Sequence, residues 1–392
     1  MRQSIKIFNL LWLFTLLISC SKQGDLENIQ TTNSLIGFGT SINQGSNFLS
    51  RGNAFTNDFV GYANPIMTMR MFCAVTENSN FDASTHTFNH IYNAEISRET
   101  AREWYIMPAN SSDVISNKYW VGAEKHSFFA FAPYQIPGAV ITSPINTTGT
   151  PSIQYTIPTN NVKDHIDLLY ASHLNIKATN SVPLFFKHAL SKVYFSVKMK
   201  NEVTLPNKDK INILSLSLKN IWTSGSLHFK KSSTPATNPI EGNENDYTTI
   251  EWRLEAGANN KTEQWSVDAN STDLSHLKTQ IIAAADAELA TGEVAVTEIP
   301  IIKMDNALFM IPQPFTESNT ILTITYSHYI DNGTGSPKTE IKKVYTPILN
   351  QWTDGTAYLY TIAFNPYSNI APITTKTVVT DYNHEDISQN PK

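Results

Sequence analysis

Two histidines four residues apart, His86 and His90, are the first residues whose type and spacing could bind a metal ion. On a helix this spacing places both rings on one face, which suits a shared zinc ion. The neighbouring Thr, Phe and Asn residues favour a strand or a loop instead. Positions four apart on a strand lie about 13 Å from each other, so one ion cannot bind both rings. We therefore predict no metal site here.

A second group that could do chemistry is the cluster of Asp164, His165 and Asp167. A hydrolase would need a nucleophile beside such a base, often on a Gly-x-Ser-x-Gly turn, and the sequence contains no such motif. His188 lies in an apolar stretch, which is typical of a partnered interior histidine. We predict that none of these residues is catalytic.

Motifs for ligands and cofactors are also missing from the sequence. Glu241, Glu244 and Asp246 lie in a Gly/Asn-rich loop that could attract calcium, but their spacing does not match a calcium-binding loop. Neither a phosphate-binding Gly-x-x-x-x-Gly-Lys nor a dinucleotide fingerprint occurs. Cys73 lies in the apolar run 69–75 and is predicted to be a small buried hydrophobe. The sequence thus predicts a protein that is not an enzyme and has no cofactor.

The N-terminus carries the most specific local signal. Arg2 and Lys6 precede an apolar run over residues 7–18, which is too short to span a membrane and predicts a signal peptide over residues 1–20. Because Cys20 follows the small Ser19, the segment resembles a lipobox, in which Cys20 is acylated and becomes the mature N-terminus. The alternative is an ordinary secretory signal with a chance cysteine. Acyl chains contribute about 0.8 kcal/mol per buried CH₂, so they would anchor the chain to a bilayer.

Composition limits the remaining function classes. The chain has 392 residues, enough for two domains, with 16% charged and 11% aromatic residues. This composition favours an extracellular all-β protein over a cytosolic enzyme. A formal net charge of −5 without a basic block argues against a nucleic-acid partner. Cys20 and Cys73 are the only cysteines, so Cys73 has no intramolecular partner once Cys20 is acylated, and stability must then come from packed cores rather than from disulfides.

The first β-domain is predicted over residues 52–203, around the stretch 182–197. Val193, Phe195 and Val197 fall at every second position, which is the alternation of a half-buried strand. Turn residues separate the other candidates, and the pattern suggests a sandwich. The expected strands are 67–75, 104–107, 127–133, 152–157, 166–171 and 184–200.

The second β-domain is predicted over residues 204–392, including a polar tail. A hairpin over 321–330 and 341–345 is indicated by the turn residues Asp331-Asn-Gly333. Apolar residues near one face also predict a helix over 274–290, with Gly292 as its stop. The other expected strands are 211–218, 226–229, 307–311, 356–364 and 373–380.

Residues 21–51 form an N-terminal extension that is polar except for the run from Leu35 to Gly39. This run, with Leu35, Ile36 and Phe38, is a candidate first strand. Arg51 and Gly52 lie in a Ser/Asn/Gly-rich stretch between this strand and the domain, so the Arg51–Gly52 bond is a candidate protease site. The alternative is that Arg51 is a solvated loop residue.

Four segments then occur in a recognisable order. They are Asp-Leu-Leu-Tyr-Ala over 167–171, the Pro-Leu-x-Phe-x-His-Ala-Leu run over 183–190, Leu-Phe-Met-Ile-Pro-Gln over 308–313, and Trp-x-x-Gly-x-x-Tyr-x-Tyr over 352–360. In this order and spacing the chain resembles the fimbrillin family of Bacteroidetes, the Mfa-like pilus subunits and surface lipoproteins.

The resemblance implies two tandem transthyretin-like β-sandwiches with at most one or two short helices. It implies a surface location at the outer membrane or in a fimbria, with other pilus subunits as partners and a host protein or glycan as an adhesion target. It also implies cleavage after Arg51, removal of a plug strand containing Leu35, Ile36 and Phe38, and strand exchange. The donor would be the segment with Ile373, Val378 and Val379. The chain could be a shaft, tip or anchor subunit.

A second function class is a stand-alone glycan-binding surface lipoprotein. Tryptophan rings stack on sugars, and exposed pairs of them would favour this function. The alternative is that most of these rings pack in the two cores. The residues concerned are Trp104, Trp120, Trp222, Trp252, Trp265 and Trp352.

Overall fold

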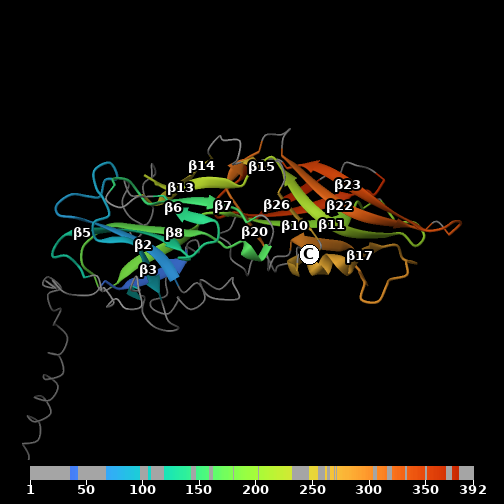
Figure 1. The fold of residues 1–392 in the computed structure, drawn as a ribbon, viewed down its shortest axis with the longest axis horizontal. Coiled ribbons are helices and arrows are strands. Elements are labelled where there is room, and N and C mark those ends of the chain that lie inside the picture. The colour runs from blue at the N-terminus through green and yellow to red at the C-terminus, as the bar shows by residue number, and fades with distance from the viewer. Residues whose placement is uncertain are drawn as a thin grey trace, which may run out of the picture.

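The structure is a computed structural model, and its strands form two stacked pairs of sheets along an elongated molecule (Figure 1). The chain is nearly all β, as predicted. The residues described are 36–42, 68–97, 105–106, 119–142, 147–158, 162–179, 181–201, 203–231, 247–254, 261–262, 265–268, 270, 272–302, 307–315, 320–331, 333–348, 351–367 and 373–378.

A seven-stranded sheet forms one end of the molecule, in the order β1-β9-β8-β5-β2-β3-β4. Both of its faces are buried, because successive residues of β2 and β5 point into two different apolar clusters. Its strands are β1 Phe38–Ile42, β2 Thr68–Thr76, β3 Ile91–Ser97, β4 Tyr105–Ile106, β5 Lys125–Ala132, β8 Leu169–Ile176 and β9 Val182–His188.

A four-stranded sheet in the order β14-β13-β7-β6 covers one face of this seven-stranded sheet. Phe229 of the smaller sheet packs on Phe129 and Phe131 of β5, with ring centroids 4.9 and 5.2 Å away. These edge-on and tilted contacts make the sandwich core strongly aromatic. The strands are β6 Ala139–Ile141, β7 Ser152–Thr156, β13 Ser224–Lys230 and β14 Thr249–Arg253.

The other end of the molecule is built from a five-stranded and a six-stranded sheet. The five-stranded sheet has the order β19-β10-β25-β26, with β20 also on β10, and it contains β10 Ser191–Met199, β19 Glu298–Ile302, β20 Leu308–Met310, β25 Ala357–Phe364 and β26 Ile373–Val378. The six-stranded sheet has the order β18-β17-β11-β22-β23, with β16 on β11, and it contains β11 Lys210–Lys219, β16 Trp265–Asp268, β17 Gln280–Ala283, β18 Val294–Ala295, β22 Ile321–Ile330 and β23 Lys338–Pro347.

Two short strand pairs and two 3-10 helices complete the described elements. They are β12 Ile221–Trp222 with β15 Lys261–Thr262, β21 Gln313–Pro314 with β24 Gln351–Trp352, η1 Val162–Asp164 and η2 Thr272–Lys278.

The hairpin predicted in the second half of the chain is confirmed. β22 and β23 pair over their whole length, from Ile321 opposite Pro347 to Ile330 opposite Lys338.

Strand pairing crosses the expected boundary between residues 203 and 204 in both directions. β10 precedes this boundary but pairs with β19, β20 and β25, which follow it. β13 follows the boundary but pairs with β7, which precedes it. Each end of the molecule therefore contains strands from both sides of this boundary. The division into residues 52–203 and 204–392 stays a prediction.

The stretch expected as one strand over 184–200 is two strands. The residues Ala189 and Leu190 separate β9 from β10, because the chain passes here from the seven-stranded to the five-stranded sheet. All residues of β10 from Ser191 to Val197 are buried, since the strand has neighbours on both edges and cover on both faces. The expectation of a half-buried strand was wrong in this respect.

The helix predicted over 274–290 was also wrong. The chain forms η2 and then β17 within that range. Leu274 and Leu277 are buried at the three-residue period of a 3-10 turn, while Ile281 and Ile282 are both buried on the strand. The apolar residues that suggested one long helix thus belong to a 3-10 helix and to the short strand that follows it.

Candidate functional site

The first strand lies at an edge of the seven-stranded sheet. β1 runs parallel to β9 from Phe38 opposite Val182 to Ile42 opposite Phe186. The Val182 amide donates to the Gly37 carbonyl at 2.8 Å, which extends the ladder by one bond. The strand begins three residues after Leu35, and Leu35 lies outside the described residues.

The side chains of this segment fill an apolar cluster on the outer face of the sheet. Ile36 and Phe38 are each 6% exposed, and the Phe38 ring packs edge-on against Phe128 with centroids 5.8 Å apart. Leu184 and Phe186 of β9 belong to the same cluster. Loss of β1 would uncover these two side chains and the hydrogen-bonding edge of β9.

The expected donor strand pairs within its own chain. β26 is antiparallel to β25, from Ile373 opposite Ile362 to Val378 opposite Ala357. It is an edge of the five-stranded sheet, whereas β1 is an edge of the seven-stranded sheet, so the structure does not bring the two segments together. Val379, Cys20, Arg51 and Gly52 lie outside the described residues.

The polar groups singled out in the first sandwich make contacts within the chain. His188 is a buried, partnered histidine as predicted: its Nδ1 lies 2.5 Å from the accepting Oδ2 of Asp167. His165 is buried apart from this pair, with its Nδ1 3.2 Å from the Phe309 backbone. Burial lowers the pKa of His165 to about 4, against the opposing effect of that backbone contact. The Oγ of the nearby Ser191 donates to the Thr353 carbonyl.

The two histidines considered for metal binding do not share a site. His86 lies in a turn, where its Nδ1 contacts the Asp82 amide at 2.9 Å, whereas His90 faces Tyr119 and His126. Within the part of the chain that the structure describes, no group of three or more His, Cys, Asp or Glu is placed to hold a metal ion.

Cys73 is fully buried in β2, and burial raises the pKa of its thiol well above the usual value. A protonated, inaccessible thiol is unreactive. We expect no modification of Cys73 by a thiol reagent in the native protein and complete modification after unfolding, as measured by intact mass. Stoichiometric labelling under native conditions would contradict this placement.

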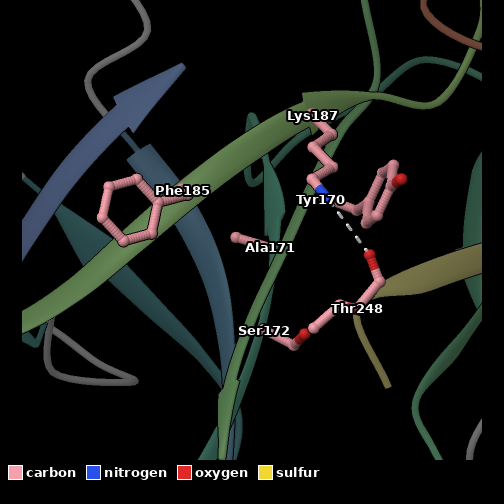
Figure 2. Close-up of a pocket in the computed structure, with 6 residues that line it drawn as sticks. All are labelled: Tyr170, Ala171, Ser172, Phe185, Lys187 and Thr248. Carbon is pink, nitrogen blue, oxygen red and sulfur yellow. Dashed lines mark hydrogen bonds between the residues drawn. The ribbon is translucent and has the colours of Figure 1, made fainter. Parts of the chain in front are cut away.

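A small pocket that opens to solvent lies beside β8 and β9 (Figure 2). Its polar groups bond within the chain: Lys187 Nζ donates to the Thr248 carbonyl at 3.5 Å and Ser172 Oγ to the Tyr247 carbonyl at 2.7 Å. The lining therefore offers an apolar wall more than a set of converging polar groups.

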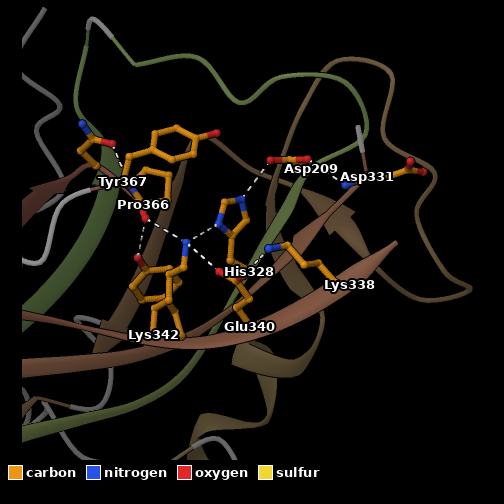
Figure 3. A network of polar contacts seen from close by, with 10 residues as sticks. Asp209, His328, Asp331, Lys338, Glu340, Lys342, Pro366 and Tyr367 are labelled. Atoms are coloured by element: carbon orange, nitrogen blue, oxygen red, sulfur yellow. Dashed lines mark hydrogen bonds and ion pairs between the residues drawn. The ribbon is translucent and has the colours of Figure 1, made fainter. Parts of the chain in front are cut away.

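The six-stranded sheet contains a network of polar contacts around the buried His328 (Figure 3). His328 Nε2 donates to Asp209 Oδ2 at 3.0 Å, and both residues are buried. Lys342 Nζ lies 3.3 Å from His328 Nδ1 and donates to the Pro366 carbonyl. Burial, more than any other effect, lowers the pKa of His328. The network ties β22 and β23 to the segment after β25, which is a structural role.

None of the described helices is long and apolar enough to cross a membrane. Among the tryptophans whose side chains are described, Trp120 and Trp352 are 1% and 2% exposed, whereas Trp222 and Trp252 are half-buried, with Trp252 Nε1 donating to the Ala189 carbonyl at 2.8 Å. The ring of Trp104 and that of Trp265 lie outside the described side chains.

Comparison with solved structures supports the fold. A fimbrial protein from Bacteroides vulgatus superposes with a TM-score of 0.54 at 17% identity, over 87% of this chain and 98% of that one. A proposed cell adhesion protein from Bacteroides ovatus gives 0.46 at 19% identity over 90% and 98%, and the fimbrial anchor protein Mfa2 from Porphyromonas gingivalis gives 0.32 at 10% over 89% and 99%. The likeness to the Bacteroides vulgatus protein, at 17% identity, extends to the fold alone.

A comparison with curated protein sequences finds no match. The family model described as fimbrillin-like, in contrast, matches residues 73–381, well over half of the 392 residues. The match begins inside β2 and includes all described strands from β3 to β26. This chain belongs to the fimbrillin-like family.

Proposed function

We propose that the chain is a non-enzymatic, adhesive surface subunit of a fimbria, and that it occupies an end of the polymer because it does not donate its C-terminal strand. The observation that carries this role is the pairing of β26 with β25 in the same chain. A subunit that keeps this strand cannot lend it to a neighbour. Family membership supports the fimbrial setting, and a structural rather than catalytic role.

The second part of the proposal is that β1 is a replaceable plug. A neighbour's extended segment would take its place on β9, forming a hydrogen-bond ladder and filling the same apolar pockets. Ile36 and Phe38 are the buried side chains that such a segment must replace. Four or five buried side chains at about 1.5–3 kcal/mol each would contribute on the order of 10 kcal/mol, enough to hold subunits together without covalent bonds.

Anchoring and plug removal are coupled by their order along the chain. Cys20, the proposed lipid attachment, and β1 both precede Arg51, whereas all the other described strands follow it. Cleavage after Arg51 would therefore disconnect the domain from its lipid and free β1 for exchange in a single step. An uncleaved chain stays plugged and attached to the outer membrane, which is the state expected of an anchor.

We expect an Arg51→Ala variant to remain at full length in the membrane fraction and to be absent from sheared surface fibres, as measured by immunoblotting of both fractions. The matched control is Arg253→Ala, since Arg253 is an exposed arginine on β14 whose guanidinium pairs with the neighbouring Glu251. The control should be processed like the wild type. Arg51→Ala protein in the fibres would overturn the role of this bond.

The stand-alone glycan-binding lipoprotein is less well supported. That function needs exposed aromatic platforms, and Trp120 and Trp352 lie inside the two cores. A host protein or glycan remains the proposed target of the assembled fimbria.

A further inference from the structure

The outer edge of the six-stranded sheet carries an unusual combination of exposed groups. β23 is ten residues long and is the terminal strand of that sheet, so no other described strand pairs with its far side. Ile341 is 64% exposed and Tyr345 46% exposed on this strand. A long edge strand with unpaired backbone groups and exposed apolar side chains is a template for pairing with another chain.

Charges along β23 restrict which partner can pair. Lys338, Glu340, Lys342 and Lys343 follow one another along the strand. Lysines on an edge ordinarily oppose strand pairing. If the partner is an antiparallel second copy of β23, the register decides which residues lie opposite one another. A register that places like charges opposite each other is disfavoured.

In every register with a two-fold axis perpendicular to the sheet, the axis passes through a single residue of β23. This follows because side chains that lie opposite one another must point to the same face of the sheet. A centre at Glu340 places Glu340 opposite Glu340 of the second copy. Centres at Lys342 and Lys343 place each lysine opposite itself. All three registers are penalised by like charges.

A centre at Ile341 removes these clashes. It stacks the exposed Ile341 on its own copy and places Glu340 opposite Lys342 twice, once on each side of the axis. Thr339 then lies opposite Lys343, and Lys338 opposite Val344. The carboxylate of Glu340 already accepts from Lys338 at 2.6 Å and from Lys342 at 3.2 Å in its own chain, and each carboxylate oxygen has a lone pair for a further donor.

We propose that β23 is an interaction surface for a second copy of this chain, which pairs antiparallel to it about a two-fold axis at Ile341. The two six-stranded sheets become one continuous sheet in the dimer. The charges of β23 favour this register over the registers centred on Glu340, Lys342 and Lys343. This surface lies on a different sheet from β1, so the dimer does not depend on strand exchange.

Cysteine cross-linking reads the register directly. In this dimer the two Ile341 Cα atoms are about 5 Å apart, within the range of a disulfide, whereas the two Lys343 Cα atoms are displaced by about 13 Å along the strands. The test uses the full chain with Cys20→Ser in detergent, under mild oxidation. Ile341→Cys should give about tenfold more disulfide-linked dimer than Lys343→Cys on a non-reducing gel.

A mixing experiment provides an independent readout. Thr339→Cys and Lys343→Cys lie opposite each other across the two copies, so each variant alone should stay monomeric and their mixture should form a linked heterodimer. Equal cross-linking at 341 and 343, or no gain on mixing, would overturn the proposal. In that case β23 would pair with an extended segment of a different protein or would face solvent. Both substituted positions are exposed, so the fold should tolerate them.

Discussion

With the chain cut after Arg51, a Phe38→Ala variant should release its N-terminal fragment at least a hundredfold more readily than the wild type. The Phe38 ring is 6% exposed and packs on Phe128, so its truncation removes a buried aromatic contact. Such truncations cost about 3–5 kcal/mol, and each 1.4 kcal/mol changes an equilibrium constant tenfold. The measurement is the fraction of fragment that stays bound after size-exclusion chromatography, quantified by mass spectrometry.

The matched control for this release is Val140→Ala. Val140 is an apolar residue on β6 that is 63% exposed, so its truncation should leave the fragment bound as in the wild type. Equal retention of the fragment in the Phe38→Ala protein would mean that this side chain does not hold β1, and the plug hypothesis would lose its energetic basis.

The second large effect is a loss of stability in acid, below pH 6.5. Burial lowers the pKa of His126 to about 4, with His90 acting in the same direction, and burial lowers the pKa of His165 to about 4. Because the unfolded chain titrates near 6.5, it takes up a proton first as the pH falls, which favours unfolding. The difference between 6.5 and 4 corresponds to about 3 kcal/mol for each group.

The free energy of unfolding should therefore be highest above pH 6.5 and fall by about 6 kcal/mol as the pH decreases to 4. Denaturant titrations at pH 7 and pH 4 measure this loss. A His126→Gln or His165→Gln variant should lose about 3 kcal/mol less over the same interval, whatever its stability at pH 7. A loss in both variants as large as in the wild type would show that these histidines are not its source.

Local patterns predicted much of the second sandwich. Ile321–Ile330 alternates in burial along nearly its whole length, and a turn with Gly333 follows, so both strands of this hairpin were recognised. Gly333 adopts a positive φ of 69°, which glycine permits without strain. These signals lie within a few residues of one another, and no distant partner is needed to interpret them.

Distant pairing explains what the sequence could not provide. β3 and β14 were not expected, because half-buried and exposed residues such as Asn93 and Thr249 interrupt their apolar pattern, and their identity as strands depends on the neighbours β2 and β13. The break at Ala189 and Leu190 is equally nonlocal, since it depends on which sheet each half joins. The parallel register of β1 on β9 spans more than a hundred residues of sequence, and no local rule specifies it.

Candidate site residues were predictable only by type. An interior role for His188 was predicted from its apolar surroundings, but its partner Asp167 lies on another segment and was considered only as part of a different group. The buried pair of His328 with Asp209 was missed, because the two residues are separated by 119 positions and neither stands in a recognisable motif.

The most direct test of the proposed assembly is the N-terminus of the protein in surface fibres. Intact mass and N-terminal sequencing of sheared fibres should give a chain that starts at Gly52, without β1 and without a lipid. A chain in the fibres that starts at acylated Cys20 would contradict the account. It would mean that β1 stays in place and that the protein acts as an anchored surface lipoprotein.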